Sequence, residues 1–160
     1  MNLVKYNDPI LKQKSEPFSF QDPSFDPIEF SKELVKFMYE NNAINLTAIQ
    51  VGIPLRIFAM RGSPQNFVCI NPRIVQPSEA VVLLEEASVT YPGLSVKIKR
   101  PQHCRARFSM PNGDVRTETF TGMTARVFQQ SIDFLDGKVY YANANPIHRE
   151  QALRKWNRIK

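Results

Sequence analysis

The sequence predicts an α+β fold in which short antiparallel or mixed sheets surround a central helix at about residues 124–135. Three observations support this prediction. A helical pattern near the N-terminus is followed by short strand patterns between residues 56 and 121, and a second helical pattern comes after them. Helices and strands that occupy separate runs of a chain are typical of α+β proteins. A chain of 160 residues is long enough for one domain with a real hydrophobic core.

The first predicted helix begins after Asp26, which is followed by Pro27 and then by Glu29. An aspartate cap, a proline at the first helical position and an acid in the first turn are the usual signals of a helix start. The pattern ends near residues 41–42. The apolar side chains that recur at helical spacing are Ile28, Phe30, Leu34, Phe37 and Met38.

Short strands are expected from six segments that are separated by proline and glycine. They are residues 56–60, 67–70, 80–84, 94–99, 104–109 and 115–121. Asn112-Gly113 predicts a two-residue hairpin turn between the last two of them. The central helix follows and is expected to stop at Gly137.

Composition places the chain among ordinary globular proteins of the cytoplasm. Residues 80–84 form the longest useful apolar run, far short of the roughly 18 residues that a membrane span needs. The N-terminus has no secretory apolar segment. Cys69 and Cys104 show no paired framework, which indicates two reduced thiols. We therefore expect a cytoplasmic protein with no membrane partner and no DNA partner.

Three segments resemble the motifs of peptide deformylases, in the order and at the separations of that family. Residues 43–50 (AINLTAIQ) are similar to G-x-G-L-A-A-x-Q, residues 86–93 (EASVTYPG) to E-G-C-L-S-V-P-G, and residues 129–137 (QQSIDFLDG) to Q-H-E-x-D-H-L-x-G. The similarity runs from about residue 3 to about residue 141. It implies a peptide-deformylase-like domain at residues 1–145.

The same resemblance implies that the metal site of the family has been lost. In the family the Cys and the two His bind a divalent metal, and the Glu beside the first His acts on the metal-bound water. Ser88, Gln130 and Phe134 stand at the three ligand positions, and Ser131 replaces the Glu. A barely acidic hydroxyl, a carboxamide and a phenyl ring are poor ligands or none for zinc or iron.

We therefore expect a catalytically inactive pseudo-deformylase with no cofactor and no catalytic residue. Two alternatives stay open: an active deformylase that removes formyl from N-formylmethionyl peptides with an altered metal site, and a basic module that binds RNA or the ribosome on a relic scaffold. His103 and His148 have no partner ligand at a fixed spacing. We expect Gln130 to contact Ser88 directly or through one water, the Phe134 ring to occupy the volume of the lost metal, and Arg100 or Arg126 to neutralise Asp133.

The peptide-binding part of the family's apparatus is better preserved. By resemblance, Gln50 and the backbone N–H of Val89 would face the formyl oxygen, while the backbone at Ile44 and Ala87 would pair with an extended peptide. A pocket of methionine size is expected between the central helix, at Val127, and residues 44–46. The alternative is that these residues only pack a relic groove. Replacement of the two motif glycines, at positions 43 and 45, argues against high affinity.

Residues 146–160 form a basic C-terminal tail, predicted to be a helix that starts at Asn145-Pro146. The tail resembles, in position and charge, the basic helix that bacterial deformylases dock on the ribosome. The resemblance implies a possible partner in the ribosome or a nascent peptide. The alternative is an amphipathic helix packed on its own domain by Leu153 and Trp156. The basic residues expected to contact ribosomal RNA are Arg149, Arg154, Lys155, Arg158 and Lys160.

Overall fold

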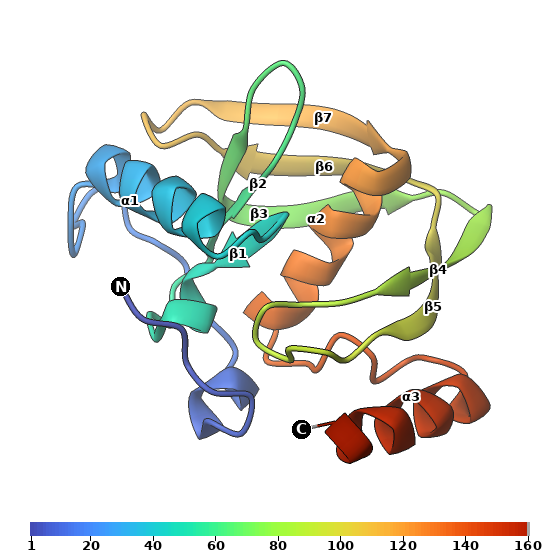
Figure 1. The fold of residues 1–160 in the computed structure, drawn as a ribbon. Helices are drawn as coiled ribbons and strands as arrows, with labels where there is room; N and C mark the ends of the chain where they lie inside the picture. The colour runs from blue at the N-terminus through green and yellow to red at the C-terminus, as the bar shows by residue number, and fades with distance from the viewer. Residues whose placement is uncertain (160) are drawn as a thin grey trace.

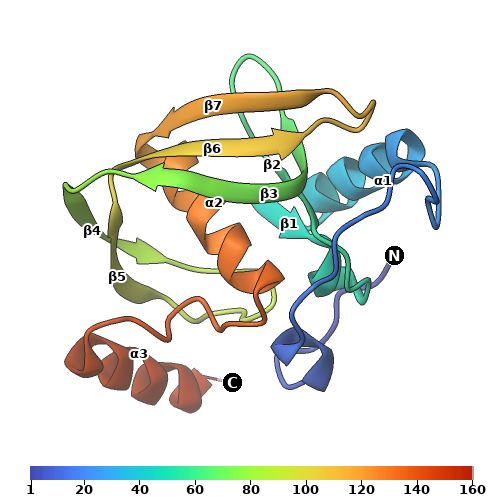
Figure 2. The same cartoon turned by 180° about the vertical axis from the view of Figure 1, so that it is seen from behind.

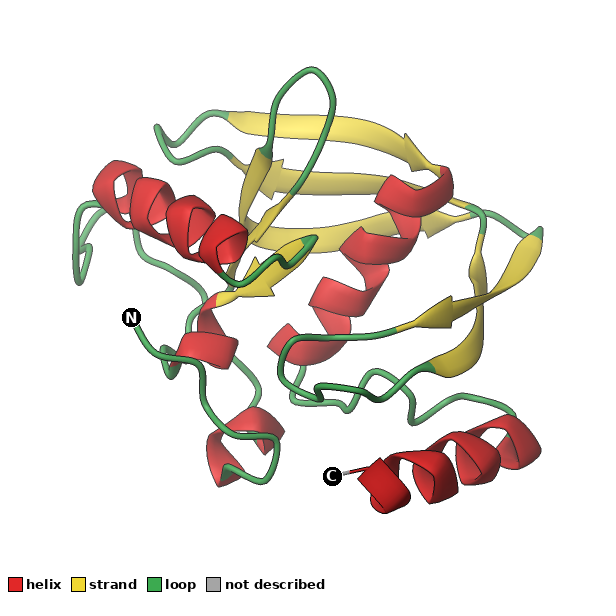
Figure 3. Ribbon diagram, viewed as in Figure 1, coloured by secondary structure: helices red, strands yellow, loops and turns green. Residues whose placement is uncertain are grey.

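A computed structural model describes residues 1–159, and Lys160, named above among the basic residues, lies outside this range. A long helix, α2 (Gly122–Leu135), lies between two sheets (Figure 1). Strands occupy the middle of the chain, with α1 before them and α2 and α3 after them (Figure 3). This arrangement confirms the α+β prediction.

Within residues 1–159 the strands form a five-stranded sheet, in the order β1-β2-β3-β6-β7, and a two-stranded sheet of β4 and β5. All of these pairings are antiparallel. β1 and β4 are both outermost strands, so each has one edge without a strand partner. The bounds are β1 (Asn45–Thr47), β2 (Ile57–Met60), β3 (Phe67–Pro77), β4 (Val81–Glu86), β5 (Val96–Pro101), β6 (His103–Ser109) and β7 (Val115–Thr121).

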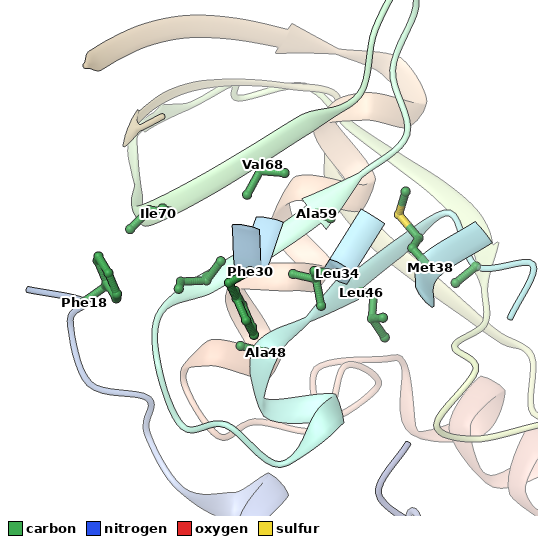
Figure 4. Close-up of a cluster of buried hydrophobic side chains, with 11 residues drawn as sticks. Phe18, Phe30, Leu34, Met38, Leu46, Ala48, Ala59, Val68 and Ile70 are labelled. Carbon is green, nitrogen blue, oxygen red and sulfur yellow. The ribbon is translucent and has the colours of Figure 1, made fainter. Parts of the chain in front are cut away.

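The helix α1 (Pro27–Glu40) begins and ends as predicted. The Asp26 carboxylate accepts a hydrogen bond from the backbone N–H of Ile28 at 2.9 Å, and Pro27 occupies the first helical position. The buried side chains of α1 pack with β1, β2 and β3 in one hydrophobic cluster. Figure 4 shows this cluster, in which Leu34 and Met38 from the helix lie near Leu46 from β1.

The helix α2 ends before Gly137, also as predicted. Gly137 has φ +71°, a conformation that L side chains rarely adopt. A Cβ atom there would lie 2.6 Å from the backbone oxygen of Lys12, so the position has no room for a side chain. Lys12 belongs to the 3₁₀ turn Pro9–Lys12, and the glycine therefore lets α2 stop against the N-terminal segment.

Three local predictions are corrected by the structure. The strand β1 was not expected from the sequence, and β3 continues to Pro77 rather than stopping at residue 70. The loop of the β6–β7 hairpin has three residues, 111–113, rather than the predicted two. The Met110 N–H donates to the Asp114 backbone oxygen at 2.7 Å, and the loop lies between these two residues. Gly113 takes φ +93°, as expected when a turn is followed by one left-handed residue.

The C-terminal helix α3 (Pro146–Ile159) packs on the rest of the chain along one side. Trp156 is buried, and its indole N–H donates to the Pro92 oxygen at 2.8 Å. Its ring lies 5.0 Å from that of Tyr6 and 6.2 Å from that of Tyr91, both distances between ring centroids. Arg154, Lys155 and Arg158 remain exposed. No helix among residues 1–159 is both long and apolar enough to cross a membrane.

Candidate functional site

A cavity of about 640 Å³ lies between the start of β1, the end of β4 and the first half of α2. Most of its walls come from three separate stretches of the chain, residues 41–45, residues 85–89 and residues 123–130 of α2, and Leu3 and Pro92 complete the lining. Ile44 and Met123, at its margin, leave about half of their side-chain surface exposed, 49% and 56%. The cavity therefore offers apolar surface beside two strands that each have an unpaired edge.

The polar wall of the cavity is closed by Asn45, the residue that replaces the second motif glycine. Its amide nitrogen donates to the Gln130 side-chain oxygen at 3.0 Å and to the Ser131 hydroxyl at 2.8 Å. Three positions at which the chain differs from the family motifs are thus joined in one hydrogen-bond network. Ser131 also donates to the Val127 oxygen at 2.9 Å, so its hydroxyl both accepts and donates a hydrogen bond.

The direct form of the expected contact between Ser88 and Gln130 is wrong. The Ser88 hydroxyl instead accepts a hydrogen bond from Gln50 Nε2 at 3.2 Å. Gln130 turns its own amide N–H groups to the Ala87 oxygen, at 3.1 Å, and to Glu86 Oε1, at 3.3 Å. The prediction failed because it considered only Ser88 as a partner for Gln130. The Gln130 side chain is long enough to reach backbone and carboxylate groups beyond Ser88.

Phe134, at the third ligand position, is buried with 2% of its surface exposed, as expected. Its ring belongs to a hydrophobic cluster that includes Ile49 and Leu94, and it stacks on Tyr140 with 6.2 Å between ring centroids. Burying such a ring contributes roughly 1.5 to 3 kcal/mol. The third ligand position has therefore become part of the core.

Beneath the network lies a buried group of four charges. Glu86 accepts hydrogen bonds from both Arg100 and Arg126, and Arg100 also pairs with Asp133 at 2.9 Å. Arg100 is thus the residue that neutralises Asp133. Burial disfavours the Arg100 charge, but the hydrogen bonds and charges of Glu86 and Asp133 outweigh this and raise its pKa. Burial raises the pKa of Asp133 as well, helped by the charge of Glu86 and opposed by Arg100.

The side chains at the three ligand positions do not fit the metal that the resemblance implies. The hydroxyl of Ser88 and the amide of Gln130 are engaged by neighbouring protein groups, and Phe134 offers no donor atom. Zinc and iron sites of this type need three thiolate, imidazole or carboxylate ligands. Across residues 1–159, no three His, Cys, Asp or Glu side chains come together in a way that could hold a metal ion.

The residues predicted to bind peptide are only partly brought together. Ile44, Ala87 and Val89 line the cavity, whereas Gln50 is buried beside it. The Gln50 oxygen accepts hydrogen bonds from Thr47, and its nitrogen donates to Thr90 at 2.8 Å as well as to Ser88. Asn45 was not predicted to take part in this site, although its place in a glycine position of the motif was the signal that could have identified it.

Comparisons with known proteins agree on one family. The model of the polypeptide deformylase family matches residues 1–150. The peptide deformylase of Thermodesulfovibrio yellowstonii is 32% identical over 165 residues, which cover 100% of this chain and 98% of that protein. The enzyme of Pseudothermotoga lettingae is 34% identical over 149 residues and is matched over 92% of this chain and 84% of its own length.

Solved structures give the same result. A crystal structure of peptide deformylase from Plasmodium falciparum superposes with a TM-score of 0.89 at 27% identity, and covers 99% of this chain and 94% of that one. A complex of the Plasmodium falciparum protein with an inhibitor has a TM-score of 0.87 at 29% identity, with 98% and 97% covered.

Proposed function

The chain belongs to the polypeptide deformylase family, and from its altered site we propose that it binds the N-terminal residues of polypeptides without hydrolysing them. The observation that carries the proposal is the contrast between the occupied ligand positions and the open cavity beside them. The hydrogen bonds of Asn45 tie Gln130 and Ser131 into the protein, while Ile44, Ala87 and Val89 still line accessible space.

An extended peptide fits the edges of this cavity. β1 and β4 are outermost strands, and Asn45 of β1 and Glu86 of β4 both line the cavity. A peptide placed between them can form backbone hydrogen bonds with either strand, and such bonds do not depend on which side chains the protein carries. The apolar surface at Ile44, Met123 and Val127 suits an apolar first side chain such as methionine. We place this activity in the cytoplasm.

Peptide binding is tested by calorimetry with a short peptide that begins with methionine. Met123→Glu, at the cavity margin, is expected to weaken binding at least about tenfold by placing a charge on the apolar surface. Ile147→Glu, an equally exposed apolar position on α3, serves as the control. A peptide with N-methylated backbone amides is expected to bind poorly. Equal loss of binding in both variants, or no binding by the parent chain, rejects the proposal.

A second candidate is an active peptide deformylase, and the comparisons favour it. The relatives matched over nearly the whole chain carry that name, and the family model covers residues 1–150. The two candidates are separated by elemental analysis of purified protein together with a formyl-methionyl peptide assay. Binding without hydrolysis predicts turnover at background and well under one zinc, iron or nickel per chain. About one metal per chain with clear turnover selects the enzyme.

The ribosome is the partner that the basic helix α3 favours. Lys155 and Arg158 are exposed on this helix, and Trp156, between them in sequence, anchors it. Lys155→Gln with Arg158→Gln is expected to reduce salt-sensitive co-sedimentation with ribosomes by several-fold. Lys32→Gln with Lys36→Gln removes the same charge from α1 and is expected to have little effect. If both pairs behave alike, binding depends only on net charge.

A further inference from the structure

The outer face of the five-stranded sheet carries arginines on a surface that no helix covers. Cys104, Ala106 and Phe108 of β6 are buried among side chains of α2, so the residues between them point to the opposite side. These are Arg105 and Arg107, and both are exposed. Seen from behind, β3, β6 and β7 lie in front of α2 with nothing over them (Figure 2).

Strand register places more polar side chains on this face. Arg73 of β3 lies directly opposite Arg107, and Thr117 of β7 lies opposite Arg107 on the other side. Arg105 is flanked in the same way by Gln76 and Thr119. We call these six exposed residues the arginine face: Arg73, Gln76, Arg105, Arg107, Thr117 and Thr119.

The pairing of Arg73 with Arg107 is unfavourable for the protein by itself. Directly opposite residues in antiparallel strands have Cβ atoms about 4.5 to 5.5 Å apart, and like charges at this separation destabilise the sheet. No carboxylate relieves the repulsion, since none of the three arginines of the face makes an ion pair within residues 1–159. Glu118, the acid nearest in register, lies opposite Ala106 and points to the inner side.

We propose that the arginine face binds the sugar–phosphate backbone of double-stranded RNA. Phosphate groups would supply the negative charge that the face lacks, and guanidinium groups bind phosphate through two parallel hydrogen bonds. The threonine and glutamine side chains beside the arginines can exchange hydrogen bonds with phosphate oxygens and 2′-hydroxyl groups.

The composition of the face favours duplex RNA over a single strand. Single strands are held largely by stacking of bases on aromatic rings, and the six residues include no ring. Double-stranded RNA is recognised by phosphate and 2′-hydroxyl contacts with little demand on sequence, which matches a flat array of arginine, threonine and glutamine. Arg105 and Arg107 are two residues apart on one strand, about 7 Å, so neighbouring phosphates can be engaged together.

The test measures binding of a fluorescent RNA duplex of about 20 base pairs by anisotropy across a salt series. Arg73→Gln with Arg107→Gln is expected to weaken binding about tenfold or more and to lower the slope of log Kd against log salt by about 2. Arg73→Lys with Arg107→Lys retains the charge and is expected to keep the slope. The Tm of the glutamine variant should stay level or rise, because the repulsion is relieved.

Controls of equal charge separate this face from net charge. Lys32→Gln with Lys36→Gln on α1, and Lys97→Gln with Lys99→Gln on β5, are each expected to leave the slope nearly unchanged. The proposal is overturned if either control pair lowers the slope as much as the arginine pair. It is also overturned if polyglutamate or phosphatidylserine vesicles compete as well as duplex RNA, or if a single strand binds as tightly.

Discussion

The polar network at the positions that match the family's metal ligands and the cavity beside it share Asn45, Ser88 and Gln130 but differ in how they tolerate change. The network depends on particular side-chain atoms, and each of its residues has found a partner within the protein. The cavity is built from backbone edges and apolar surface, which survive many substitutions. From this difference we expect the cavity to tolerate substitution better than the network does.

Rebuilding the network as a metal site is the strongest test of this comparison. The five substitutions are Asn45→Gly, Ser88→Cys, Gln130→His, Ser131→Glu and Phe134→His. If only these five positions prevent hydrolysis, the rate of formyl-peptide hydrolysis should rise on the order of 10³-fold or more, with one divalent metal bound. The variant that keeps Phe134 should stay inactive. Full activity in the unaltered chain would contradict the comparison.

Breaking the charges beneath the network should cost a large part of the stability. Glu86→Gln leaves Arg100 and Arg126 buried without a full counter-charge, and the expected loss in unfolding free energy is about 3 to 5 kcal/mol. Arg154→Gln breaks the exposed pair with Glu150 and should cost about 0.5 kcal/mol or less. Urea unfolding measures both. Similar losses would show that the buried group is well compensated by other contacts.

Shortening one side chain of the core and one of the cavity should separate effects on stability from effects on peptide binding. Phe134→Ala removes a ring that is 2% exposed and should cost about 3 to 5 kcal/mol. Met123→Ala, at a side chain that is 56% exposed, should change stability by less than about 0.5 kcal/mol and weaken peptide binding several-fold. Thermal unfolding and calorimetry provide the two readouts. A stable Phe134→Ala protein would mean that the former ligand position is not part of the core.

Removal of the Asn45 amide should have a smaller effect. Asn45→Ala leaves the Gln130 oxygen without its donor, and the expected cost is about 1 to 3 kcal/mol. Asn157→Ala, at an exposed position of α3, removes an amide that takes no part in the network and serves as the control. An Asn45→Ala protein as stable as the parent would show that water replaces the amide.

The smallest effect is expected at alkaline pH, in the aromatic layer behind Phe134. Burial, and secondarily the charge of Tyr141, raise the pKa of Tyr91 to about 12, and burial raises that of Tyr140. Because a free tyrosine titrates near pH 10, this stabilisation is complete below about pH 10 and is lost as pH rises towards 12. Tm measured against pH should therefore fall by some degrees. Tyr91→Phe with Tyr140→Phe should flatten that fall.

Much of the fold was predictable because its signals are local. The cap at Asp26, the proline after it and the glycine at 137 act within one helical turn, so α1 and α2 were assigned with nearly correct bounds. β1 has only three residues and exists through its pairing with β2, which no local pattern reveals. The extension of β3 to Pro77 likewise depends on β6, and its register shifts twice on the way.

The site was predictable as a set of positions but not as a network. The motif frame identified Ser88, Gln130 and Phe134, and the burial of Phe134 followed from its chemistry. The partner of Gln130 could not be predicted, because Asn45 lies 85 residues away and either Gln50 or Gln130 could have reached Ser88. The charges of Arg100 and Arg126 were expected near Asp133, yet Glu86 holds both.

The chain has a single tryptophan, so its fluorescence can report on the contact between α3 and the rest of the protein. Trp156 is buried against Tyr6 and Tyr91 and bonds to Pro92, so its emission is sensitive to the position of the last helix. A red shift on mixing with protein-free ribosomal RNA, without loss of helix signal, would reveal that the segment lifts away as a unit. No dye or label would be needed, because RNA contains no tryptophan.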